Sequence, residues 1–161
     1  MPPGGSLKAK KLTALIAAVA VVFSLAGCSL SREVASLDPY APSDGVQLDK
    51  GELKLRNFMF IVDEDGNALL IGSMVNGSDE VISGTLETMD SNGEVIITDF
   101  SVAGEAKYDL GYNGNPGTEL YLEAMPGSMH SVFVRASGAD PMELPAPVMD
   151  GSLEEYRPFI D

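Results

Sequence analysis

Two places in this chain carry side chains that could do chemistry. Cys28 is the only cysteine, and its thiolate is a nucleophile that can be alkylated. His130 is the only histidine, and Met125 and Met129 lie within five residues of it. Thioether sulfur and imidazole nitrogen are the soft ligands that suit Cu(I). The sequence therefore offers one candidate modification site and one candidate metal site.

The residues before Cys28 have the pattern of a secretory signal. Met1–Lys11 is basic and lacks acidic residues, and Leu12–Ala26 is an apolar run of 15 residues. That run is too short for a membrane span, which needs about 20 residues. Leu25-Ala26-Gly27-Cys28 resembles the bacterial lipobox. The resemblance implies cleavage between Gly27 and Cys28 and a diacylglycerol thioether on Cys28, so that lipid holds the protein on the extracytoplasmic face of the cell membrane.

The segment around His130 resembles part of the periplasmic copper chaperones of the PCu(A)C kind. These are small β-sandwiches with a Pro-Gly-x-x-His-x-Met turn, and Pro126, Gly127 and His130 match it. Val132 stands where the family has methionine, and no second histidine exists for the family's earlier ligands. The resemblance spans roughly Gly51 to Val148. It implies a β-sandwich and, as an alternative function, Cu(I) handling by His130 with the two nearby methionines; no other cofactor is expected.

The same segment does not have the pattern of a hydrolase. Ser131 adjoins His130, and adjacent residues on a strand point to opposite faces of the sheet. Ser128 could share the side of His130, but no acidic residue in the segment is placed to orient the imidazole. The chain also has no Gly-x-Ser-x-Gly elbow. We therefore expect the protein not to be an enzyme.

The charge of the chain excludes one class of partner. The whole sequence has 24 acidic and 10 basic residues and a formal net charge of −14. Removing the leader takes away three lysines and no acidic residue, which leaves −17. Such a surface repels nucleic acid, so no nucleic-acid partner is expected. With Cys28 lipidated, no disulfide can form within the chain.

Composition divides the chain into four parts. Residues 1–27 are the lipoprotein signal peptide, and residues 28–47, rich in serine and proline, form a flexible, lipid-anchored tether. Residues 48–150 form the domain, and residues 151–161 form a polar C-terminal tail.

Within the domain, short alternating segments are separated by turn signals. Apolar residues alternate over 52–55 and then continue out of step at 58, 60 and 62, which predicts either a β-bulge near Arg56-Asn57 or burial of both faces of the strand. Residues 141–148 contain three prolines, which favours an edge strand or an extended crossing. Further strands are expected at 68–75, 81–89, 94–102, 118–124 and 129–136, and 107–110 is a candidate short strand. These patterns predict an all-β fold: a single antiparallel immunoglobulin-like β-sandwich of about seven strands.

The whole chain also looks like small actinobacterial cell-wall lipoproteins, through the lipobox, Tyr40–Val46 and Pro147–Tyr156. This resemblance implies an envelope-facing β-sandwich and brings no catalytic residues. The favoured function is a non-enzymatic binding or adaptor module of the cell envelope. Its partners are the membrane, through lipidated Cys28, and an envelope protein or cell-wall component. The loops Asn113–Gly117 and Asp63–Asn67 are the expected contacts, because loops on a rigid scaffold commonly carry recognition.

Overall fold

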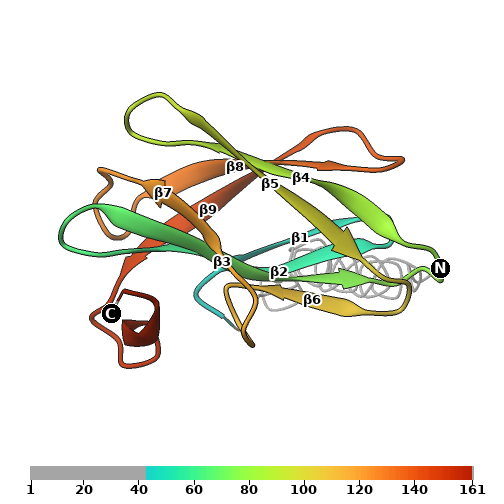
Figure 1. Cartoon of the computed structure of the whole chain (residues 1–161), viewed down its shortest axis with the longest axis horizontal. Coiled ribbons are helices and arrows are strands. Elements are labelled where there is room, and N and C mark those ends of the chain that lie inside the picture. The colour runs from blue at the N-terminus through green and yellow to red at the C-terminus, as the bar shows by residue number, and fades with distance from the viewer. Residues whose placement is uncertain (1–42, 161) are drawn as a thin grey trace, which may run out of the picture. The chain divides into compact units, whose positions relative to one another are not determined.

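Residues 43–160 form an array of β-strands in the computed structural model, which describes this part of the chain (Figure 1). The predicted signal peptide, Gly27, Cys28 and residues 28–42 of the predicted tether lie outside the described residues. Nine strands and one short 3-10 helix follow in chain order: β1 (Val46–Lys50), β2 (Leu53–Val62), β3 (Asn67–Asn76), β4 (Ile82–Met89), β5 (Val95–Val102), β6 (Lys107–Leu110), β7 (Thr118–Tyr121), β8 (Met129–Ala136), β9 (Met142–Asp150) and η3 (Arg157–Phe159). No helix in this part is long and apolar enough to cross a bilayer.

The strands form two facing layers that β9 joins into one path, nearly closed into a barrel. Figure 1 shows β4, β5 and β8 in one layer and β2, β3 and β6 in the other. The order along the path is β5-β4-β8-β9-β2-β3-β6, with β1 also paired to β2 and β7 to β3. We call β5-β4-β8-β9 the second sheet. The all-β prediction is confirmed.

Strand β9 is where the topology departs from the prediction. Residues 142–147 pair antiparallel with β8, whereas residues 148–150 pair parallel with β2. The sheet is therefore mixed and not purely antiparallel. Over 142–147, β9 is the edge of the second sheet, and Pro145 and Pro147 lie there. Proline lacks an N–H and is tolerated at an edge, which is the position that the sequence predicted for this segment.

Strand number also differs, because nine strands are present where about seven were expected. The extra strands are short: β1 has five residues, too few to give a clear alternation, and β6 has four, over the candidate short strand 107–110. Strand β1 begins at Val46, so it takes the last residues that the sequence assigned to the 28–47 tether. Gly45 is already fixed to the domain, since its N–H donates to Asn57 Oδ1 at 3.0 Å.

Strand β2 contains the predicted bulge. Arg56 pairs with Ser73 and Met59 with Ile71, so two residues of β2 oppose the single Gly72. Asn57 has φ 54°, a left-handed conformation that asparagine tolerates. A Cβ on Gly72 would lie 2.5 Å from the Phe58 ring, so glycine makes room for that fully buried side chain. The bulge prediction is confirmed.

The main core lies between the two layers. Its largest side chains are fully buried, and each stabilises the fold by roughly 1.5–3 kcal/mol relative to an exposed position. They come from both layers and include Leu55, Phe58, Phe60, Leu70, Met74, Leu86, Val132, Val134 and Leu144.

A second apolar cluster lies on the outer face of β2 and β3. Met59, Ile61 and Ile71 are buried there by the C-terminal segment, which contributes Tyr156 and the partly buried Phe159 and Ile160. The Tyr156 hydroxyl donates to Asp44 Oδ2 at 2.5 Å. Burial, together with this bond, raises the pKa of Tyr156 above its usual value. The tail therefore packs on the domain and contacts the segment that enters it.

Candidate functional site

His130 lies on the inner side of β8, half-buried. Its ring meets the buried Phe60 ring edge-on at a centroid separation of 5.2 Å and an interplanar angle of 84°. His130 Nε2 lies 2.8 Å from the main-chain oxygen of Met89. A carbonyl oxygen only accepts, so Nε2 must carry a proton. In a neutral imidazole this leaves Nδ1 as the nitrogen with a lone pair.

The structure does not bring the three predicted metal ligands to one side of the strand. Met129 precedes His130 in β8 and is 55% exposed on the outer face, because successive strand residues alternate. Met125 lies in the turn before β8 and is 79% exposed. Within residues 43–160, no group of three or more His, Cys, Asp or Glu side chains is placed to hold a metal ion. His130 is therefore the only soft ligand of the predicted set on the inner side of β8.

The two serines beside His130 take no part in a nucleophile–base pair. Ser131 faces outward, and its hydroxyl donates to Glu143 Oε1 at 2.6 Å. The Ser128 hydroxyl is buried without a hydrogen-bond partner in the described part of the chain. Neither hydroxyl is bonded to the imidazole in the described part of the chain, and the outward position of Ser131 is the one that strand alternation predicted.

The outer face of the second sheet carries exposed apolar side chains. Alternation turns the odd-numbered residues of β4, β5, β8 and β9 outward, and the even-numbered ones face the core. Five large apolar side chains, each between 44% and 59% exposed, lie on this face. We call them the apolar face: Met89, Val95, Ile97, Met129 and Phe133.

Four residues of the apolar face lie around Glu87 in the register of the strands, and Met129 lies on the same face of β8, four residues before Phe133. Met89 pairs with Val95, and Glu87 pairs with both Ile97 and Phe133. Opposed residues on one face have Cβ atoms about 4.5–5.5 Å apart. The sequence analysis missed this surface, although the alternation of apolar residues in 95–97 and 129–133 was the signal that could have found it.

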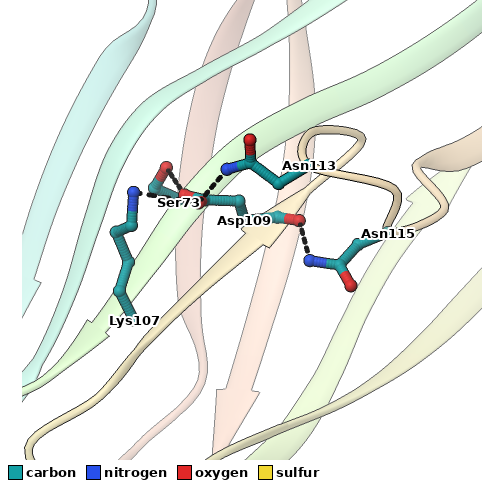
Figure 2. Close-up of polar contacts among 5 residues, drawn as sticks. All are labelled: Ser73, Lys107, Asp109, Asn113 and Asn115. Carbon is teal, nitrogen blue, oxygen red and sulfur yellow. Dashed lines mark hydrogen bonds and ion pairs between the residues drawn. The ribbon is translucent and has the colours of Figure 1, made fainter.

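A cluster of polar side chains in the layer of β2, β3 and β6 fixes the position of the loop after β6 (Figure 2). Asp109 is 8% exposed, and its Oδ1 accepts from Ser73 Oγ at 2.5 Å. Its Oδ2 accepts from Lys107 Nζ at 2.9 Å and from Asn113 Nδ2 at 2.8 Å. Its main-chain oxygen accepts from Asn115 Nδ2 at 2.9 Å.

These hydrogen bonds determine the direction in which the pKa of Asp109 is shifted. Burial raises the pKa of Asp109, but the hydrogen bonds from Ser73, Lys107 and Asn113 outweigh it and hold the pKa below its ordinary value. A carboxylate this well satisfied is a poor proton donor or acceptor near neutral pH. The cluster therefore holds the expected contact loop Asn113–Gly117 in place.

Comparison with known proteins gives a fold class. No family model matches the chain, and no curated protein matches it. Solved structures of PCuAC domains do resemble it. The apo PCuAC domain from PmoF1 is 16% identical, with a TM-score of 0.55 over 65% of this chain and 99% of that domain. The apo PmoF2 PCuAC domain is 13% identical, with a TM-score of 0.51 over 67% of this chain and 98% of that domain.

A copper-bound PCuAC domain from PmoF2 is also similar, at 14% identity and a TM-score of 0.49 over 65% of this chain and 98% of that domain. The likeness of this chain to the PCuAC β-fold, expected from the sequence, is confirmed by the two apo domains. At these identities the likeness extends to the fold alone, and the ligands of this chain are judged from its own residues.

Proposed function

We propose that this protein is a membrane-anchored, non-enzymatic binding module of the cell envelope that engages a protein partner through the apolar face. The observation that carries this proposal is the grouping of five exposed large apolar side chains on one sheet face. Exposed large apolar side chains that gather on one face of a folded domain are typical of an interaction site. The proposal of a non-enzymatic role is supported by Ser131, which faces away from the imidazole, and by Nε2 of His130, which is bonded to a carbonyl.

The anchor completes the proposal. Lipidation at Cys28, after cleavage behind Gly27, would hold the domain at the extracytoplasmic face of the membrane. There the apolar face would meet an envelope protein. The support for this location is the lipobox after a basic, apolar leader.

Site-specific crosslinking in intact cells tests the surface and the anchor together. A photoreactive residue replaces Ile97 in the full chain, and the matched control replaces Val81, which is also 59% exposed but lies before β4, off the apolar face. We expect a discrete protein adduct from position 97 only, recovered in the detergent phase of a phase-partition extraction. Adding Cys28→Ser should move it to the aqueous phase.

Either half of the proposal can fail separately. The same adducts at positions 81 and 97 would contradict binding through the apolar face. Identical partitioning of the chains with and without the Cys28→Ser substitution would contradict the lipid anchor.

Cu(I) binding at His130 is the second candidate function. The observation that favours it is the Nε2–H bond to the Met89 carbonyl, because metal-ligating histidines usually donate their other ring N–H to such a group. If the protein had this function, copper would be a transported ion and not a resident cofactor. Only one soft ligand faces that side of β8, however, so the described residues fit a tight site poorly.

A competition titration of the reduced full chain with Cu(I) decides the matter. We expect an affinity no tighter than about micromolar, or about −8 kcal/mol, and the same value for His130→Ala. Met74→Leu, at a fully buried methionine, is the control for general effects of substitution. Submicromolar binding that His130→Ala abolishes would establish copper handling instead.

A further inference from the structure

We infer that the apolar face selects a polypeptide segment in which lysine or arginine lies beside aliphatic or aromatic side chains, and that the cation binds at Phe133 between Glu87 and Glu143. This inference rests on the proposed function and adds the chemistry of the partner. It is carried by the register of the four strands, by the bonds of the two carboxylates and by the charge of the sheet.

One row of residues crosses the second sheet in register. Ile97 of β5 pairs with Glu87 of β4, Glu87 pairs with Phe133 of β8, and Phe133 pairs with Glu143 of β9. Neighbouring strands are about 4.8 Å apart, so the two glutamates flank Phe133 at a separation of about 10 Å. The row therefore alternates apolar and acidic groups, and a complementary segment would present apolar and basic side chains in turn on one of its faces.

Each of the two glutamates is held in position through one of its own carboxylate oxygens. Glu87 Oε1 accepts from Arg135 Nε at 2.6 Å and from Thr85 Oγ1 at 3.2 Å. Glu143 Oε1 accepts from Ser131 Oγ at 2.6 Å. Among the described residues these bonds use only Oε1 of each side chain, so each Oε2 is left for an incoming donor. A fixed carboxylate costs less side-chain entropy when it binds a cation than a mobile one does.

Phe133 supplies the surface between the two carboxylates. Its side chain is 44% exposed, and an aromatic ring face attracts an ammonium or guanidinium group within about 6 Å. Arg135 offsets the charge of Glu87, whereas no ion pair of the described residues involves Glu143. A cation from a partner would therefore gain both the ring and an acidic group without an internal competitor.

The surrounding charge favours the same partner. Arg135 is the only lysine or arginine in the four strands, while Asp99 and the hairpin residues Asp90 and Glu94 add to the two glutamates. With a chain charge of −14, this field attracts basic segments and repels a second copy of this chain or an anionic membrane.

Short synthetic peptides test the inference with the full chain in neutral detergent micelles, with protein-free micelles as background. The three fluorescent peptides repeat Lys-Ser-Leu-Ser, Glu-Ser-Leu-Ser and Lys-Ser-Ser-Ser and are called Lys–Leu, Glu–Leu and Lys–Ser, because residues two apart share one face of an extended peptide. We expect the Lys–Leu peptide to bind at least about tenfold more tightly than either other peptide, and to weaken as salt is added. Phe133→Ser should abolish this binding, and Glu143→Gln should weaken it at least about threefold and reduce its salt dependence.

Two control variants and two contrary outcomes complete the peptide-binding experiment. Val81→Ser and Glu119→Gln change exposed residues outside the second sheet and should leave Lys–Leu binding unchanged. Equal binding of the Lys–Leu and Glu–Leu peptides, both lost in Phe133→Ser, would overturn the cation site and leave binding through the apolar face standing. Absence of binding by any peptide would overturn the inference, while the crosslinking experiment decides the proposed function independently.

Discussion

Replacing Asn76 with Asp should lower the free energy of unfolding by at least about 3 kcal/mol at neutral pH. Asn76 is 1% exposed, and its Nδ2 donates to the main-chain oxygens of Glu80, Val102 and Ala103 at 2.6, 3.1 and 3.1 Å. Its Oδ1 accepts from the N–H and the hydroxyl of Ser78. An aspartate keeps the shape but turns the donor into a charged acceptor that faces three carbonyl oxygens.

Chemical denaturation of the full chain, followed by circular dichroism, measures this loss. Because only the protonated carboxyl can donate, the variant should regain stability as the pH falls and lose it as the pH rises. The control is Asn92→Asp in the exposed hairpin turn, where the amide donates to Asp90 Oδ2 at 3.1 Å. Water can take the place of that exposed bond, so we expect a loss of no more than about 1 kcal/mol. Equal losses for the two variants, or no pH dependence at position 76, would contradict the role assigned to the Asn76 amide.

Gly84→Ala should destabilise the protein by about 3 kcal/mol, because β4 and β8 lie too close for a methyl group. A Cβ at position 84 would overlap the main-chain oxygen of Arg135, and it would lie 2.8 Å from the Phe100 ring and 2.9 Å from Ala136 Cα. Two of these three contacts are with backbone, which cannot move without separating the paired strands. The same denaturation measurement applies.

Gly77→Ala is the matched control for position 84. A Cβ there would meet the carboxylate of Glu52, which is the end of a flexible side chain and can rotate away. We expect a change below about 1 kcal/mol for this variant. A small loss at position 84, comparable with that at position 77, would show that β4 and β8 tolerate a wider spacing than the structure implies.

Local patterns predicted much of the fold. The phase change between residues 55 and 58 located the bulge, because a single extra residue exchanges the two faces of a strand. The prolines of 141–148 placed that segment at a sheet edge, since proline cannot donate in a central ladder. These inferences needed only neighbouring residues.

Contacts between distant residues were harder to predict. The parallel pairing of β2 with β9 joins residues about 90 positions apart, and no local pattern encodes it. Methionine is apolar enough to suggest burial, and Met59 and Met74 are indeed buried, but Met89, Met125 and Met129 are exposed. Met129 and His130 are successive residues of one strand, and this was sufficient to place their side chains on opposite faces.

Strand β9 has a consequence for how the domain opens. Its first part belongs to one sheet and its last three paired residues belong to the other, so the two layers share a continuous stretch of backbone. Neither layer can lose its pairing with β9 without loosening the strand that holds the other. The amides of both layers should therefore exchange with solvent deuterium through one cooperative opening, rather than as separate halves with different protection.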